Sequence, residues 1–207
     1  GIGYSVASLS NHRFHTYARF QAPWRIPLSR WVRLLAGLTL FGFGIVLMVK
    51  ADVGLGPWDV LHQGLSVLFG IRIGRVAIGV GVLLLLLWIP LKERPGIGTV
   101  FNAVMIGLVV DLLMPWIATP EHLVLALLQM GTGVVVIGIG SGLYLTAEMG
   151  AGPRDGLMMG LVRVTGLSVR VIRTFIELTV LLGGWLLGGS IGIGTLAFAF
   201  GIGPVIQ

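Results

Sequence analysis

The amino-acid sequence contains one unit twice, at a spacing of 96 residues. Without any gap, 24 of the 76 positions in residues 36–111 are identical to their counterparts in 132–207. A chain of this composition would match itself at roughly a tenth of its positions by chance. Duplicated apolar units with a polar Gly-Pro motif in each copy are typical of many membrane transporters. The repeat therefore predicts an architecture and a site, without naming a substrate.

The composition places the outer surface of the protein in lipid. Charged residues make up 11% of the chain and the mean hydropathy is +0.98, whereas soluble domains carry about a quarter charged residues. The chain is therefore predicted to be an all-α integral membrane protein.

The excess of positive charge indicates membrane orientation rather than nucleic-acid binding. The net charge is +6, but Lys and Arg lie at the ends of apolar runs and in the N-terminal segment, as the positive-inside rule describes. Residues 1–30, where Arg alternates with aromatic residues, are predicted to be a cytoplasmic segment at the lipid headgroups.

Six apolar runs are long enough to span a bilayer, for which ~20 residues are needed. They are residues 32–50, 74–91, 98–117, 123–146, 170–188 and 192–207. Two further runs, 57–69 and 153–166, would rise only ~20 Å as helices, short of a ~30 Å hydrocarbon core. We interpret them as short re-entrant helices.

The number of crossings decides the symmetry of the halves. With three spans each, the halves are inverted relative to one another; with four, they are parallel. The three-span arrangement puts 11 of the 14 Lys and Arg residues inside and the four-span arrangement puts 10 inside, so charge does not separate them. Helix length favours inverted halves, with repeat 1 at residues 31–118, a connector with the start of the fourth span at 119–131, and repeat 2 at 132–207.

Each short helix opens with a Gly-Pro-x-Asp motif, Gly56-Pro57-Trp58-Asp59 or Gly152-Pro153-Arg154-Asp155. Gly at the N-cap, Pro at the first position and Asp near the positive helix end make well-formed helix starts, which explains the motif by itself. Interrupted helices that face one another near the bilayer centre also bind substrates and coupling ions in transporters. Both interpretations stay open for these residues.

Several other polar residues extend the candidate site. Asp52 and Glu148 precede the two motifs at matching positions, and ionisable groups within a membrane indicate function by default. Arg154, which replaces Trp58 in the second copy, would pair with Asp155 or attract an anionic group. His62 would either exchange a coupling proton or pack between helices.

The polar residues of the longer spans have structural explanations as well. Thr99 and Thr195 would cap their helices or line a pathway, and Asn102 would bond across helices or contact a ligand. Arg173 and Glu177, four residues apart, would form a local ion pair. The candidate binding residues are Asp52, Gly56, Trp58, Asp59, His62, Glu148, Gly152, Arg154 and Asp155, with Thr99, Asn102 and Thr195 as pathway residues.

Enzyme chemistry finds no support in the sequence. There is no HExxH motif and no cysteine. No metal, cofactor or nucleic acid is expected.

The segment from Ala51 through Asp59 to Leu65, followed by Pro95-Gly96-Ile97-Gly98-Thr99, resembles the bacterial YczE/YitT group of multi-pass membrane proteins. The similarity covers about residues 33–207, and the YczE branch is the closer match because the soluble C-terminal domain of the YitT branch is missing. The resemblance implies a bacterial plasma-membrane protein with duplicated halves, and an export role has been proposed for some members.

We therefore expect a small-molecule transporter or exporter that alternates access around the two motifs, with a proton as the coupling ion. The alternative is a non-transporting scaffold or accessory subunit of a membrane complex. A homodimer that forms a channel is a third hypothesis. Dry packing between the motifs would favour the scaffold.

Overall fold

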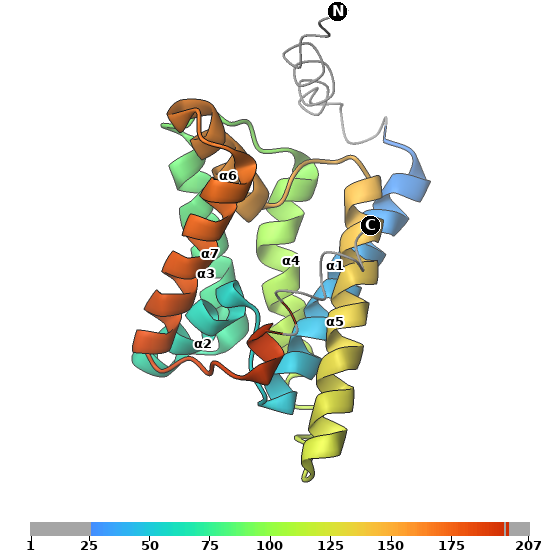
Figure 1. The fold of residues 1–207 in the computed structure, drawn as a ribbon. Helices are drawn as coiled ribbons and strands as arrows, with labels where there is room; N and C mark the ends of the chain where they lie inside the picture. The colour runs from blue at the N-terminus through green and yellow to red at the C-terminus, as the bar shows by residue number, and fades with distance from the viewer. Residues whose placement is uncertain (1–25, 197, 199–207) are drawn as a thin grey trace, which may run out of the picture.

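The computed structural model describes residues 26–196 and residue 198, and all regular secondary structure in this part of the chain is helical (Figure 1). The N-terminal segment to residue 25 and most of the predicted last span lie outside the described residues. The seven helices are α1 (Leu28–Ala51), α2 (Pro57–Phe69), α3 (Ile73–Trp88), α4 (Ile97–Leu113), α5 (Leu123–Thr146), α6 (Pro153–Thr165) and α7 (Val169–Leu186). A further helical segment begins at Ile193.

The helices repeat at the spacing of the sequence. α6 begins and ends 96 residues after α2, and α7 begins 96 residues after α3. In Figure 1, α1 runs away from the end that carries the N-terminus, and α5 runs back toward it. α6 lies near that end, and α2 lies near the opposite end.

The breaks after α1 and α5 share one unusual backbone. Asp52 and Glu148 are left-handed, with φ of 51° and 52°, and Gly54 and Gly150 have φ of 118° and 131°. The φ angles of Gly54 and Gly150 are accessible to glycine because glycine has no Cβ. Each long helix is therefore stopped by local geometry, and the chain turns toward a new helix start.

Each break is held by the opposite half. The Gly98 amide donates to the Met149 carbonyl, and the Gly194 amide donates to the Val53 carbonyl, both with nitrogen–oxygen distances of 2.8 Å. The two bonds are related by the 96-residue spacing. We call them the two clasps; they satisfy polar backbone that the interruptions would otherwise leave unpaired inside the protein.

Helices α1 and α5 cross at paired glycines. A Cβ added to Gly37 would lie 2.8 Å from the Gly140 carbonyl oxygen, and one added to Gly44 would lie 2.8 Å from that of Gly133. Small residues allow this approach where lipid provides no hydrophobic drive for helices to associate. Gly44 and Gly140 thus allow the two helices to pack closely, whereas a Cβ added to Gly79 or Gly142 would meet open space.

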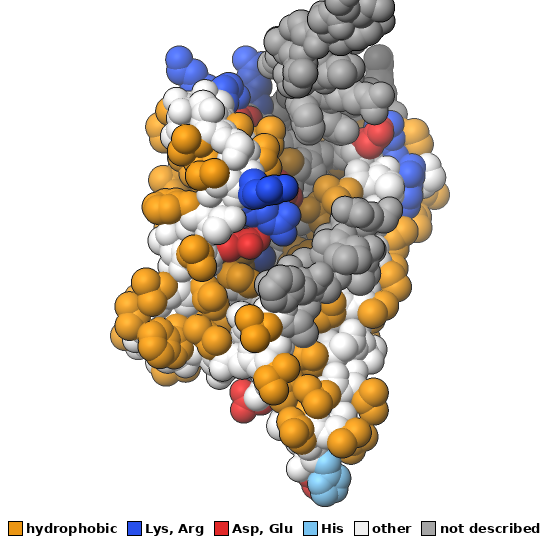
Figure 2. Space-filling model, viewed as in Figure 1, with side chains coloured by type: hydrophobic (Ala, Val, Ile, Leu, Met, Phe, Trp, Pro, Cys, Tyr) orange, Lys and Arg blue, Asp and Glu red, His pale blue; other side chains and the backbone are white. Residues whose placement is uncertain are grey.

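The surface and helix lengths identify a membrane protein. Hydrophobic side chains cover much of the visible face, and the visible Lys and Arg side chains lie in its upper half (Figure 2). Helices α1 and α5 are long and apolar enough to cross a membrane, and the pair α2–α3, bent by 112°, counts as a third span if it is taken as one. The prediction of an all-helical membrane protein is confirmed at this level.

Candidate functional site

The short helices begin as the sequence predicts. Gly56 and Gly152 are the N-caps, with backbone angles within 2° of each other (φ −63° and −62°, ψ 153° and 155°), and proline follows each at the first position. The amide that proline lacks is one that has no partner inside a helix. The helix starts are thus fixed locally by the Gly-Pro pair.

Each short helix packs against a helix of the other half, and the two contacts exchange large and small residues. Gly184 of α7 makes room for the α2 backbone at Val60 and Leu61. At the equivalent contact, the large residue is Trp88 of α3 and the small one is Gly156 of α6, where an added Cβ would overlap the indole ring. The Trp88 indole also donates to the Pro153 carbonyl at 3.0 Å. This contact fixes the tip of α6.

A cavity of about 300 Å³ is lined by side chains from the first turns of α2 and α6, and all seven helices contribute to its lining. Its walls follow the repeat. Seven pairs of lining residues stand 96 positions apart: Phe41/Ile137, Trp58/Arg154, His62/Met158, Ala77/Arg173, Val80/Ile176, Gly81/Glu177 and Asn102/Phe198. The cavity therefore lies between equivalent surfaces of the two halves.

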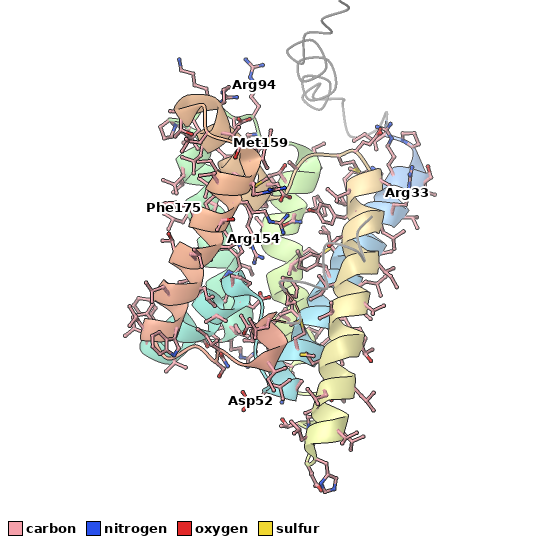
Figure 3. All side chains as sticks on the ribbon, viewed as in Figure 1. Arg33, Asp52, Arg94, Arg154, Met159 and Phe175 are labelled. Atoms are coloured by element: carbon pink, nitrogen blue, oxygen red, sulfur yellow. The ribbon has the colours of Figure 1, made fainter. Side chains whose placement is uncertain are left out.

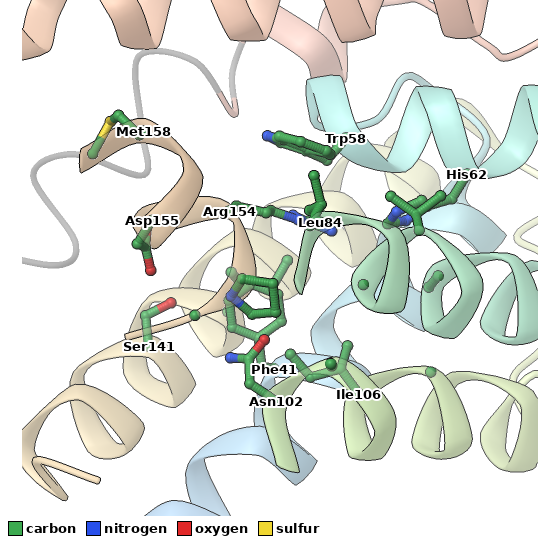
Figure 4. Close-up of a pocket in the computed structure, with 18 of the residues that line it drawn as sticks. Phe41, Trp58, His62, Leu84, Asn102, Ile106, Ser141, Arg154, Asp155 and Met158 are labelled. Carbon is green, nitrogen blue, oxygen red and sulfur yellow. The ribbon is translucent and has the colours of Figure 1, made fainter. Parts of the chain in front are cut away.

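Charged and aromatic groups from both motifs meet at this cavity. Arg154 extends from α6 beneath Trp58 toward His62 (Figure 4), with its guanidinium carbon 4.9 Å from the Trp58 ring centroid. Asp59 Oδ1 lies 4.0 Å from Arg154 Nη2 and 3.5 Å from His62 Nδ1. The Asp59 side chain is 7% exposed, and Oδ1 has no hydrogen-bond partner among the described residues. The site thus holds a buried carboxylate near one guanidinium and one imidazole, with no hydrogen bond at that oxygen.

The second motif carboxylate is held differently. Asp155 Oδ2 accepts a hydrogen bond from the Tyr144 hydroxyl at 3.1 Å. Arg154 lies beside Asp155 in sequence, but its nearest described carboxylate partner is Asp59 of the other half. The hypothesis of an internal Arg154–Asp155 pair is therefore replaced by a pair between the halves. Cation–ring stacking on Trp58 adds to that contact.

Arg173 and Glu177 belong to the lining, although sequence reasoning gave them only a local role. Their ion pair exists, with 2.9 Å between Nε and Oε1, and both residues line the cavity. The sequence alone could not assign this role, because only the structure shows that their counterparts Ala77 and Gly81 line the cavity too. One half therefore supplies charges where the other supplies small side chains.

Two predicted acids lie outside the cavity lining. Asp52 is exposed and lies toward the lower end of the molecule, away from Arg154 (Figure 3). Glu148 is 55% exposed and pairs with Arg30 at 3.0 Å. Left-handed backbone at helix ends turns both side chains outward, so the structure does not bring them to the site.

The remaining predicted residues divide between lining and support. Thr99 and Thr195 are buried and accept from the amides of Gly96 and Gly192 at 3.1 and 3.3 Å, as helix caps. Gly56 lies under the ring of Phe198. Trp58, His62, Asn102, Gly152, Arg154 and Asp155 line the cavity. Asp59 lies directly behind Arg154 and His62.

Among the described residues, no group of three or more His, Asp or Glu side chains gathers as metal ligands. The chemistry on view is that of charge pairs, hydrogen bonds and an aromatic face.

Similar chains occur in bacteria. A model described as a family of unknown function (DUF6198) matches residues 28–207. An uncharacterized protein of Haemophilus influenzae is 40% identical over 174 residues, which cover 84% of this chain and 80% of the relative. The uncharacterized membrane protein YczE of Bacillus subtilis is 36% identical over 183 residues, covering 86% and 84%. The resemblance to YczE is thereby confirmed. No solved structure matches the chain.

Proposed function

The chain belongs to the family of unknown function DUF6198, and on that premise we propose that it moves small molecules across a bacterial plasma membrane as an exporter. In this proposal the halves are inverted repeats with three spans each, and α2 and α6 are re-entrant helices whose first turns supply residues to the substrate site. The N-terminus is cytoplasmic.

The observation that carries the proposal is the position of the cavity. Its lining pairs residues of the two halves at the 96-residue spacing. Transporters with inverted repeats bind substrate between their repeats, at interrupted helices. A cavity between equivalent halves can open to one side of the membrane when a contact on that side breaks and the equivalent contact on the other side holds. A scaffold would need no such cavity.

The clasps are the contacts that we expect to exchange. One joins Gly98 to Met149 and the other joins Gly194 to Val53, and each ties an interrupted segment to the opposite half. Because the clasps are equivalent, loosening one while the other holds would convert one access state into the other at little cost.

The coupling ion in this proposal is a proton. Asp59 and His62 face one another at 3.5 Å beside the cavity, and buried acids with a histidine partner are common in proton relays. Arg154 shares the same carboxylate, so proton binding and substrate binding would be coupled through Asp59.

The test is transport by purified protein in proteoliposomes that are loaded with a defined mixture of metabolites and antibiotics. With an imposed pH gradient, mass spectrometry should find at least one compound that leaves wild-type vesicles and stays in vesicles with Asp59→Asn/Asp155→Asn. The control is Asp52→Asn, a matched change at an exposed carboxylate outside the cavity, and it should transport normally. If no compound moves in a wild-type-dependent manner, the transporter proposal is wrong. If the double variant fails to fold, the two carboxylates are structural.

A further inference from the structure

We propose that Arg154 binds the oxyanion group, a carboxylate or a phosphate, of a small molecule whose apolar body fills the rest of the cavity. This inference rests on the proposed function, since it names the class of substrate for the same site.

Arg154 has hydrogen-bonding capacity that the described residues do not use. Its guanidinium carries five N–H donors in a planar fork, which matches a carboxylate or phosphate in a bidentate manner. Its nearest described carboxylate oxygen is Asp59 Oδ1 at 4.0 Å, beyond hydrogen-bonding distance. The side chain lines the cavity and is 32% exposed, so a ligand can reach the fork.

Asp59 does not form a hydrogen bond with the Arg154 guanidinium. Its Oδ1 is buried and has no hydrogen-bond partner among the described residues. A buried charge is costly unless it is both paired and hydrogen-bonded. Asp59 thus holds Arg154 in place by charge without using its donors. A ligand oxyanion would form the hydrogen bonds that Asp59 does not.

The surroundings favour an anion over a cation. The first residues of α6, Gly152 to Asp155, line the cavity, and the N-terminus of a helix contributes a positive partial charge. The carboxylates of the lining are already engaged, Asp155 by the Tyr144 hydroxyl and Glu177 by Arg173. A cationic ligand would also meet the positive charges of Arg154 and Arg173 on the same wall.

The rest of the lining sets the size and character of the molecule. Phe41, Leu84, Ile106 and Ile137 provide apolar wall, and Asn102 provides an amide. A volume of about 300 Å³ is at the small end of ligand pockets. These features suit a compact acid with one ring or a short branched chain.

The experiment measures equilibrium binding to the full chain in lipid nanodiscs by calorimetry, with four probes that share a phenyl body. Phenylacetate and phenyl phosphate carry the oxyanion, phenylacetamide is neutral, and phenethylamine is cationic. We expect one or both anions to bind at least about tenfold more tightly than the other two probes, as a bidentate charged contact predicts. The stronger anion tells whether the natural ligand is a carboxylate or a phosphate. Equal binding of the amine or amide would overturn the proposal, and this arm needs no variant.

Variants then assign the contact. Arg154→Gln should weaken anion binding at least about tenfold, and Arg154→Lys should fall between, because a single ammonium lacks the fork. Arg94→Gln, at an arginine outside the cavity lining (Figure 3), should bind as wild type. Asp59→Asn should bind the anion more tightly, because the competing internal charge is gone. Full anion affinity in a folded Arg154→Gln protein would overturn the proposal.

Failure of the inference and failure of the proposed function give different results. If anions bind in an Arg154-dependent manner but no compound is transported in proteoliposomes, the anion site is supported and the transporter proposal is wrong. Transport restricted to neutral or cationic compounds would leave the transporter standing and remove the anion site.

Discussion

α2 and α6 have the same backbone and different chemistry. Both start at a Gly-Pro pair and both end at a left-handed glycine, Gly70 with φ 65° and Gly166 with φ 72°. Yet the first carries Trp58 and His62 into the cavity, whereas the second carries Arg154 and Met158. The comparison teaches that glycine and proline keep the backbone of the two helices equivalent. The side chains between them can then differ, so that each half supplies different functional groups to the cavity.

The largest expected effect on stability comes from a substitution that gives α6 the residue found at the equivalent position of α2. Gly156→Val gives α6 the residue of the first half, Val60, but its side chain would overlap Trp88. We expect a loss of about 3 kcal/mol in unfolding free energy, as for severe overpacking, measured by thermal unfolding in detergent.

The matched test is the double variant Gly156→Val/Trp88→Gly, which recreates the Val60–Gly184 arrangement of the other half. It should be more stable than either single variant, since the two sites share one contact. If the double variant loses the sum of the two single losses, the exchange of large and small residues is not a compensating pair.

Glycine contacts between the long helices give the next effect. Gly37→Ala places a Cβ 2.6 Å from the Tyr144 backbone nitrogen, so α1 and α5 must separate. We expect a loss of about 2 kcal/mol and a similar loss for Gly44→Ala at the equivalent crossing point.

The control for this pair is Gly79→Ala, where the added methyl group meets open space. It should be neutral or slightly stabilising, because alanine favours helix more than glycine does. Equal destabilisation at Gly37 and Gly79 would show that backbone propensity, and not the crossing, decides the effect.

The two threonine caps test how equivalent the two halves are. Thr99→Val removes the acceptor for the Gly96 amide at 3.1 Å and should cost about 1 kcal/mol, as a lost helix cap does. Thr195→Val should cost no more, because its bond to the Gly192 amide is longer at 3.3 Å. Unfolding midpoints of the two valine variants and of the matched serine variants, which keep the hydroxyl, measure this. A larger loss for Thr195→Val would reverse the expected order.

The smallest effect is expected at the exposed acids before the two motifs. Glu148→Gln removes the ion pair with Arg30, and exposed pairs contribute about 0–1 kcal/mol. Asp52→Asn should be neutral, since asparagine also tolerates the left-handed backbone found there. Unfolding midpoints in low and high salt measure both variants. A loss of transport with either variant would show that the acid takes part in function and contradict this prediction.

Local sequence signals predicted the helix starts and the kind of structure around them. The Gly-Pro pairs located the first residues of α2 and α6, and the predicted bounds of α5, residues 123–146, agree with the structure. Such features depend on neighbours in the chain, so they can be inferred from spacing alone. The repeat also predicted that Asp59 of the first motif and Arg154 of the second belong to one site.

The partners of those residues could not be predicted in the same way. Arg154 pairs with Asp59 across the halves instead of with its neighbour Asp155, and Arg173 joins the cavity from α7. Asp52 and Glu148 share the motif in sequence but face outward. A repeat shows which positions are equivalent, and only the packing of α2 on α7 and α6 on α3 shows which side of each helix faces the cavity.

By itself, the sequence determined that this chain is a membrane protein, that it contains one unit twice, and that a helix is interrupted at the same place in each unit. These features follow from hydropathy, from identity at a fixed spacing and from the local chemistry of glycine and proline, all of which can be read along the chain. The tertiary structure decided which side chains from distant segments meet, because that depends on how crossed glycine contacts and exchanged large and small residues set the two halves against each other.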